Sequence, residues 1–208
     1  MKKILVAYAT MAGSTAEVAQ KVGDVLASRG LQVEVLPISA VSSLNAYDGV
    51  VVGGPMIMGW HREAVRFLKQ NRAALQRVPL AVFITAMSLT QTGETSVEDV
   101  SVFVDEKLPK PPKAAGSLSF RERYARLGNY VRPILAAVRP GQPASLGVFG
   151  GRLEYGRLKW WAVLFAMLII QAPAGDRRNW DAIQTWAHGL PEHFQMETET
   201  PEREPQPA

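Results

Sequence analysis

The chain has 208 residues, of which 47% are hydrophobic, as expected for one globular domain with an insertion or a tail. It contains no cysteine, which excludes disulfide bonds, thiolate-held iron–sulfur clusters and cysteine nucleophiles, so redox chemistry would require a bound cofactor. No signal-peptide pattern follows Met1-Lys2-Lys3, and we expect a cytoplasmic protein.

Charge is unevenly distributed along the chain. Residues 191–208 hold five glutamates and one arginine, so the remainder carries 22 basic and 14 acidic residues and a net charge of +8. We expect this Pro- and Glu-rich tail to be disordered and residues 1–190 to form a basic folded body. No known base-reading module accompanies the positive charge, so nucleic acid is not an expected partner.

The chain opens with a strand, a loop and a helix. An apolar run ends at Thr10, and a helical repeat of apolar residues begins at Val18 and continues to Gly30, where a left-handed residue would end the helix. The connecting loop consists of Thr10, Met11, Ala12, Gly13, Ser14 and Thr15.

This loop suits a phosphate group. Backbone N–H groups at a helix start lack intrahelical acceptors, and the hydroxyls of Thr10, Ser14 and Thr15 add side-chain donors. The loop has no lysine and no P-loop motif, so it predicts mononucleotide binding of another kind. The alternative is an ordinary turn in which Ser14 and Glu17 form a capping box.

The pattern T-x-x-G-x-T followed by a helical alanine, here Thr10, Gly13, Thr15 and Ala19, resembles the flavodoxin signature. Ala7 is smaller than the residue usual at its position in that signature. The resemblance implies FMN as the cofactor and an α/β fold, a doubly wound parallel sheet of five strands in the order 2-1-3-4-5.

Residues 32–36 and 49–53 predict the second and third strands of this sheet. Strands 1 and 3 flank the point where the winding reverses, so the loop after the third strand belongs at the same crevice. Its expected cofactor-binding residues are Pro55, Met56, Ile57, Met58 and Gly59. Met56, Met58 and Trp60 would pack against the flavin ring or, alternatively, only seal the sheet.

Residues 80–85 predict the fourth strand, and its polar loop supplies the third set of expected cofactor contacts: Met87, Ser88, Leu89, Thr90 and Gly93. Residues 94–119 predict mostly loop with one helical turn around Val100–Val104. A helix follows, with Phe120, Tyr124, Leu127 and Val131 facing the sheet and an interruption or restart at Pro133.

Residues 145–151 predict the fifth strand, and Asn179 is the expected cap of a final helix that buries Trp180, Ile183, Ala187 and Leu190. Between them lies a helical insertion, residues 152–178. Its uninterrupted apolar part, residues 160–170, is shorter than the roughly 20 residues that cross a bilayer.

The insertion has two interpretations. Trp160 and Trp161 beside Arg152, Arg157 and Lys159 are typical of an interfacial anchor, which predicts peripheral membrane contact through residues 157–170. A basic run over residues 107–139 would support that contact or attract a polycarboxylate substrate. Alternatively, the apolar helix forms a homodimer interface or packs on its own core, and the basic residues only form a solvated face.

Gly150-Gly151-Arg152-Leu153-Glu154-Tyr155, the Arg-Leu-Lys-Trp-Trp segment from Arg157 and the Asn179-Trp180 helix resemble flavodoxin-type menaquinone-dependent protoporphyrinogen dehydrogenases. The resemblance implies an FMN-dependent enzyme that oxidises a reduced tetrapyrrole with a quinone as acceptor. The chain departs from those enzymes at Ile57 and Met58, where they have basic and aromatic residues.

The alternatives are a flavodoxin-like electron carrier, a protein-docking module, or a domain that has lost its cofactor. Carriers tend to be acidic, which argues against the first of these. No acid–base pair is identified, and no metal-ligand spacing appears. His61 is expected to be a capping or surface residue, with contact to the substrate as the alternative, and His188 and His193 are expected at the surface.

Overall fold

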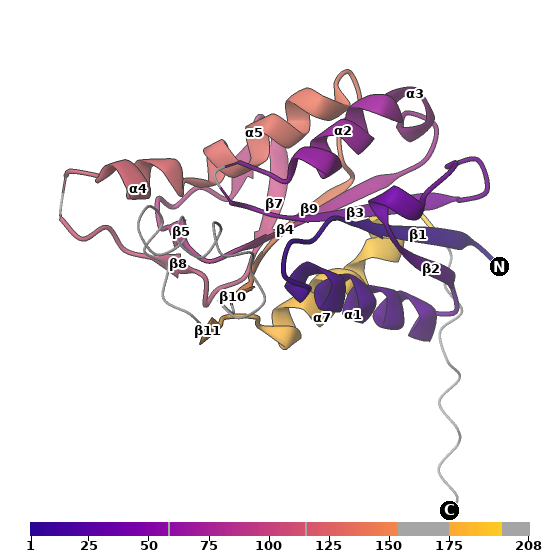
Figure 1. Ribbon diagram of the computed structural model, residues 1–208, viewed down its shortest axis with the longest axis horizontal. Coiled ribbons are helices and arrows are strands. Elements are labelled where there is room, and N and C mark those ends of the chain that lie inside the picture. The colour runs from indigo at the N-terminus through magenta and orange to yellow at the C-terminus, as the bar shows by residue number, and fades with distance from the viewer. Residues whose placement is uncertain (58, 115, 154–174, 197–208) are drawn as a thin grey trace, which may run out of the picture.

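The computed structural model describes residues 1–57, 59–114, 116–153 and 175–196. Its centre is a seven-stranded sheet in the order β2-β1-β3-β4-β9-β7-β6 (Figure 1). Two further pairs, β5 with β8 and β10 with β11, form small two-stranded sheets. The strands are β1 (Lys3–Tyr8), β2 (Gln32–Pro37), β3 (Gly49–Pro55), β4 (Leu80–Ala86), β5 (Leu89–Thr90), β6 (Ser96–Val97), β7 (Val100–Val104), β8 (Pro109–Lys110), β9 (Ser145–Gly150), β10 (Arg152–Leu153) and β11 (Gly175–Asp176).

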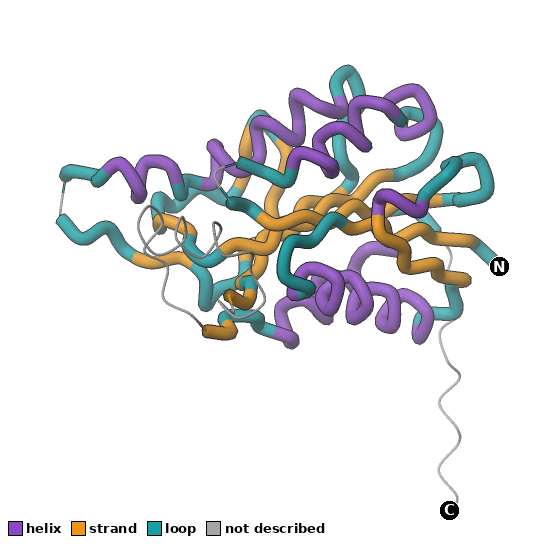
Figure 2. Tube along the Cα trace, in the orientation of Figure 1, coloured by secondary structure: helices purple, strands orange, loops and turns teal. Residues whose placement is uncertain are grey.

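Helices cover both faces of the sheet (Figures 1 and 2). The pair α1 and α7 packs on one face, and α2, α3 and α5 lie on the other, so alternate residues of β1 enter opposite cores. Leu5 and Ala7 belong to one core, while Ile4 and Val6 belong to the other. The described helices are α1 (Ser14–Ser28), α2 (Arg62–Gln70), α3 (Arg72–Leu75), α4 (Phe120–Tyr124), α5 (Leu127–Val138) and α7 (Trp180–His193), with a short 3-10 helix η1 (Ile38–Ala40).

The predicted strand order is confirmed, but the sheet has seven strands rather than the predicted five, because β7 and β6 extend it beyond β9. Strands β2, β1, β3, β4 and β9 are parallel neighbours in that sequence, which is the order 2-1-3-4-5. Every residue of β3, β4 and β9 is buried, because helices cover both faces of these strands.

The prediction for residues 94–119 is wrong in part. Val100–Val104 forms strand β7 rather than a helical turn, and β7 pairs in parallel with β9. Strand β6 then adds to β7 in antiparallel orientation. Strand β7 pairs with the backbone N–H and C=O groups at the edge of β9, which an isolated helical turn would leave unpaired, and it buries Val100 and Val102.

The predicted helix from Phe120 consists of two helices. A break at Ala125 and Arg126 separates α4 from α5, and Pro133 lies inside α5 without ending it. Phe120 is 73% exposed and does not face the sheet. Ser119 and Glu122 form a capping box that starts α4 at this position.

Two predictions about the C-terminal part are also corrected. Trp180 is 37% exposed and stacks on the Arg178 guanidinium at 4.5 Å instead of entering the core. Helix α7 continues to His193 and Phe194 is buried, so residues 191–196 belong to the folded body rather than to the predicted tail. Residues 197–208 lie outside the described residues.

Most of the insertion also lies outside the described residues, namely 154–174, including the predicted membrane contact at 157–170. Its two described ends meet, because β10 and β11 pair in antiparallel orientation. None of the helices in the described ranges has the length and apolar content that crossing a membrane requires.

Candidate functional site

The three predicted loops follow neighbouring parallel strands and therefore lie at one rim of the sheet. We call them the first loop (residues 10–15), the second loop (55–59) and the third loop (87–93). Hydrogen bonds connect their bases: Ala9 N donates to Gly53 O (2.9 Å), and Met56 N donates to Thr85 O (2.8 Å). The rim is thus one continuous structure.

The first loop turns at Gly13, which has φ 87° and forms the N-cap of α1. The hydroxyl of Thr10 accepts a hydrogen bond from Gly13 N (3.0 Å) and holds the turn closed. Among the described residues, no acceptor is found for the backbone N–H groups of Met11, Ala12, Ser14 and Thr15. These donors lie at the positive end of a 15-residue helix, which is the arrangement that binds anions.

The hydroxyl of Thr15 is used differently from the prediction. Thr15 is fully buried, and its Oγ1 shares a hydrogen bond of 3.0 Å with Thr85 Oγ1 at the end of β4. This bond fastens the start of α1 to the neighbouring strand. Thr10 and Ser14 remain the hydroxyls that the first loop offers to a ligand, since Thr10 is partly exposed and Ser14 is 8% exposed.

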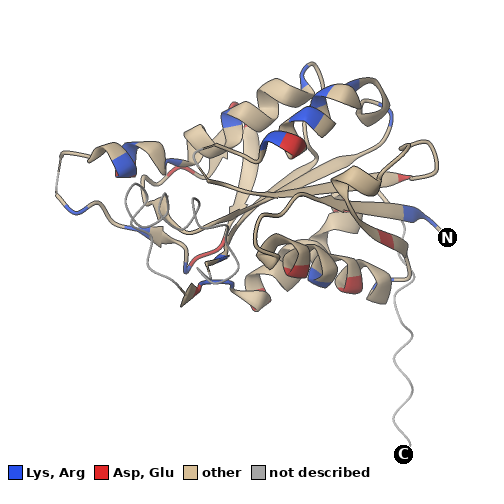
Figure 3. Ribbon diagram, viewed as in Figure 1, with Lys and Arg blue, Asp and Glu red and all other residues tan. Residues whose placement is uncertain are grey.

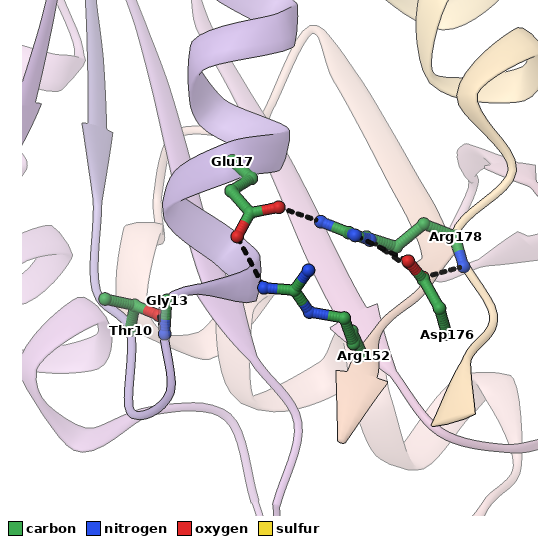
Figure 4. Close-up of polar contacts among 6 residues, drawn as sticks. All are labelled: Thr10, Gly13, Glu17, Arg152, Asp176 and Arg178. Carbon is green, nitrogen blue, oxygen red and sulfur yellow. Dashed lines mark hydrogen bonds and ion pairs between the residues drawn. The ribbon is translucent and has the colours of Figure 1, made fainter. Parts of the chain in front are cut away.

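The alternative capping box is not formed, because Gly13 is the N-cap and no side chain caps α1. The Glu17 carboxylate instead pairs with Arg152 (2.5 Å) and with Arg178 (2.6 Å), as Figure 4 shows. Arg178 also binds Asp176 at 2.5 Å, and its side chain is only 4% exposed. Both ends of the insertion are therefore attached to the first turn of α1.

These contacts set the ionisation of Glu17. The hydrogen bond from Arg178, together with the positive charges of Arg178 and Arg152, lowers the pKa of the Glu17 carboxyl despite the opposing effect of desolvation. Glu17 is thus ionised at neutral pH, and the cluster keeps its ion pairs.

The second loop buries two of the side chains predicted to contact a flavin. Met56 is 7% exposed and Trp60 is 4% exposed, and Trp60 Nε1 donates to Gly54 O (3.1 Å). This placement agrees with the alternative prediction that they seal the sheet. Ile57 is 36% exposed and Gly59, which has φ 118°, is partly exposed, so these two residues are accessible in the second loop. Met58 lies outside the described residues.

His61 directly follows the second loop as the N-cap of α2, but its side chain does not cap the helix. Its Nδ1 atom is buried and has no hydrogen-bond partner among the described residues. The side chain is partly exposed but does not cap the helix, so of the two expected positions for His61 the capping one is wrong.

The third loop is partly covered by α4. Leu89 and Thr90 are buried, with Thr90 N donating to Ala125 O and Thr90 Oγ1 donating to Glu122 O, both at 2.8 Å. Their side chains are not presented at the rim, contrary to the prediction. Ser88 and Gly93 are exposed.

Two groups fix the carbonyls of the third loop. Tyr130 donates its hydroxyl to Ser88 O (2.8 Å), and Arg177 donates to Met87 O (2.8 Å). Burial raises the pKa of Tyr130 to about 12, so this phenol remains a donor at neutral pH. The third loop is held from both sides, by α5 and by the end of the insertion.

The prediction from sequence missed Thr85 and the paired arginines Arg177 and Arg178. A threonine at the end of an otherwise apolar strand is a signal for a polar partner at the rim. Two cations directly before the last helix would have indicated acceptors nearby. No group of three metal-ligating side chains occurs in the described part of the chain.

The family described as flavodoxin domain matches residues 5–178. The comparison with curated proteins found no match.

Similar solved structures include a short-chain flavodoxin associated with a non-canonical PDU bacterial microcompartment, with 25% identity over 41% of this chain and 62% of that chain and a TM-score of 0.38. Oxidised flavodoxin 1 from Bacillus cereus has 23% identity over 40% and 60%, with a TM-score of 0.35. Two-electron reduced flavodoxin from Megasphaera elsdenii has 9% identity over 89% and 98%, with a TM-score of 0.48. The chain spans less than two thirds of the length of the first two.

Proposed function

Since the chain belongs to the flavodoxin domain family, whose cofactor is FMN, we propose that it is an FMN-dependent oxidoreductase that transfers electrons. The observation that carries the proposal is the first loop, with its open backbone donors at the start of α1 and beside two further loops of the same rim. When bound, FMN supplies the electron-accepting and electron-donating chemistry that a chain without cysteine lacks.

The residues of the first loop fit the phosphate of FMN. The N–H groups of Met11, Ala12 and Ser14 would bind phosphate oxygens, with the Thr10 and Ser14 hydroxyls as additional donors. The loop carries no lysine, so backbone dipoles and the helix terminus supply the positive potential.

The other two loops would hold the ring system. Ile57 offers an apolar surface at the second loop, and the backbone near Ser88 is fixed by Tyr130 and Arg177. A rigid rim loses little freedom on binding, which favours tight association.

A flavin titration tests this proposal. We expect the purified protein to show flavin absorbance, or to acquire it on addition of FMN, and to bind FMN at least 10-fold more tightly than riboflavin, because riboflavin lacks the phosphate. A protein that binds neither flavin would contradict the proposal.

For the reaction, we propose oxidation of a reduced tetrapyrrole such as protoporphyrinogen, with a quinone as acceptor. Two features support it: the resemblance over Gly150 to Tyr155 and the last helix, and the excess of basic residues, which suits a substrate with carboxylates. In an anaerobic mixture with FMN-loaded protein, protoporphyrinogen should bleach the flavin absorbance, and a menaquinone analogue should restore it. If protoporphyrinogen does not bleach the flavin, oxidation of this substrate is excluded, and the protein would act as an electron carrier or a protein-docking module.

We also propose that residues 157–170 contact the membrane, where a lipid-soluble quinone resides. Sedimentation with anionic vesicles tests this contact. A homodimer formed through the same segment would instead double the mass in light scattering and leave the protein in the supernatant.

A further inference from the structure

A hollow of about 260 Å³ lies beside the third loop, where α4 ends and α5 begins. Three arginines dominate its lining, and Figure 3 shows basic residues on α4 and on the α2–α5 side of the molecule. The lining residues are Glu94, Arg123, Arg126, Gly128, Asn129 and Arg132.

Glu94 neutralises the charge of one of these arginines, Arg126. Its carboxylate pairs with Arg126 (2.5 Å) and accepts a hydrogen bond from Gly128 N (3.3 Å) in the first turn of α5. Although desolvation acts in the opposite direction, these contacts lower the pKa of Glu94, which therefore stays ionised. The N-terminus of α5 and Arg126 are thus already neutralised.

Arg123 and Arg132 are not neutralised in this way. Both side chains are exposed, and neither has an acidic partner among the described residues. The Arg132 guanidinium lies over Gly128, where an added Cβ would be 3.4 Å from its Cζ atom. With one glutamate and three arginines, the hollow carries a net charge of +2.

The backbone around the hollow is fixed before any ligand arrives. Asn129 Nδ2 donates to Arg123 O (2.6 Å), which joins the end of α4 to the first turn of α5. The two helices therefore hold Arg123 and Arg132 at the same hollow, and a ligand need not order the backbone.

The hollow adjoins the rim of the candidate site. Glu94 directly follows Gly93 of the third loop, and Thr90 of that loop is bonded to Glu122 and Ala125 at the α4–α5 junction. An anion in the hollow would lie at the outer end of the third loop.

We propose that this hollow binds a carboxylate or phosphate group of a small anion through the Arg123 and Arg132 guanidinium groups. Guanidinium presents two parallel N–H donors that match these groups, and Arg123 and Arg132 are the two lining arginines that Glu94 does not neutralise. The proposal does not depend on flavin binding, because it concerns a different set of residues.

Calorimetric titration of the full chain with citrate and with inorganic phosphate, at low ionic strength and with FMN in excess, tests the proposal. We expect one saturable site for at least one of these anions. The double variant Arg123→Gln/Arg132→Gln should weaken it at least 10-fold, because two charge-assisted contacts are lost. The control Arg66→Gln/Arg77→Gln, with the same loss of charge on α2 and beyond α3, should stay within twofold.

Failure to detect saturable binding of either anion would overturn the proposal, as would equal weakening in the control, since general attraction to a basic surface would then explain the binding. Phosphate bound in the first loop would not respond to the double variant and would count against the hollow. If the protein binds no FMN yet binds these anions in the expected pattern, the proposed function fails and the hollow stands.

Discussion

Gly13 determines the shape of the first loop. Its φ of 87° lies in the left-handed region, where L side chains are strained, and its N–H is held by the Thr10 hydroxyl. The N–H groups of Met11, Ala12 and Ser14, which have no acceptor among the described residues, flank this turn. The left-handed backbone conformation of this turn therefore explains the glycine in the T-x-x-G-x-T motif.

We expect Gly13→Ala to lower the free energy of unfolding by about 1–2 kcal/mol and to weaken FMN binding more than riboflavin binding. Denaturant unfolding and flavin fluorescence titrations measure the two effects. Gly30→Ala is a matched control, because Gly30 has φ 79° at the other end of α1. It should lose similar stability without changing FMN affinity, and equal loss of affinity in both variants would contradict the role of the first loop.

Gly150 allows the end of the insertion, at Arg177, to pack directly against β9. A Cβ atom at this position would lie 1.8 Å from the backbone oxygen of Arg177, so β9 and the end of the insertion can approach only at a glycine. Arg177 is thereby placed where its side chain reaches Met87 O.

Gly150→Ala should lower the free energy of unfolding by about 2 kcal/mol or more, since backbone must move to admit the methyl group. Urea unfolding measures the loss. The control Gly189→Ala adds a methyl group where no atom lies within 4 Å, and it should be neutral or stabilising in helix α7. A Gly150→Ala variant as stable as the natural chain would refute the close approach.

At the scale of elements, the ion pairs among Glu17, Arg152, Asp176 and Arg178 attach the insertion to the domain. Strands β10 and β11 bring Arg152 and Arg178 together, and both reach the same carboxylate on α1. The first loop leads into this turn of α1, so one helix end serves both the proposed phosphate site and the attachment of the insertion.

The lowered pKa of Glu17 gives this attachment a pH dependence. A carboxyl with a depressed pKa in the folded state stabilises that state above its ordinary value of 4.5, and the contribution disappears as the pH falls through the lower folded value. Because Glu17 is 43% exposed, solvent screens the pairs and the contribution is small.

We expect Glu17→Gln to cost about 0.5–1 kcal/mol at pH 7 and to differ less and less from the natural chain as the pH is lowered below 4.5. Urea unfolding at several pH values measures this. Glu63→Gln removes an exposed glutamate from the first turn of α2, which controls for the helix dipole, and should have a smaller effect. A constant difference at every pH would show that the ion pairs are not responsible.

Elements differed in how well the sequence predicted them. Strands β1, β3 and β4 are continuous apolar runs with glycine, proline or polar residues at their ends, so both their type and their limits could be read locally. Strand β7 could not be, because five residues that contain three valines stay extended only where β9 offers a free edge.

At the scale of the whole molecule, the rim joins segments far apart in the chain. Thr15 of the first loop is bonded to Thr85 at the end of β4, directly before the third loop. Arg177 is bonded to Met87 of the third loop, and Arg178 is bonded to Glu17 in the first turn of α1. A ligand that bridges the first and third loops should therefore stabilise the whole fold rather than one end of it.

We expect FMN at 100 times its dissociation constant to add about 2.7 kcal/mol to the free energy of unfolding and to raise the melting temperature by about 5–10 °C. Scanning calorimetry measures this shift. Riboflavin at the same concentration should raise it less, because the donors of the first loop stay unfilled. Equal shifts for the two flavins would contradict phosphate binding there.

The sequence by itself determined the main strands, the position of the first loop and the need for a cofactor in any redox chemistry, because these follow from apolar periodicity, a glycine in a hydroxyl-rich turn and the absence of cysteine. The strand order was implied by the resemblance of the first loop to the flavodoxin signature, and the structure agrees with it. Only the tertiary structure decided which side chains reach the rim. It buried Met56, Trp60 and Thr90, and it brought Arg178 to Glu17 across most of the chain. Side-chain direction and long-range charge pairing depend on how elements pack, and local pattern carries no information about contacts between residues so far apart.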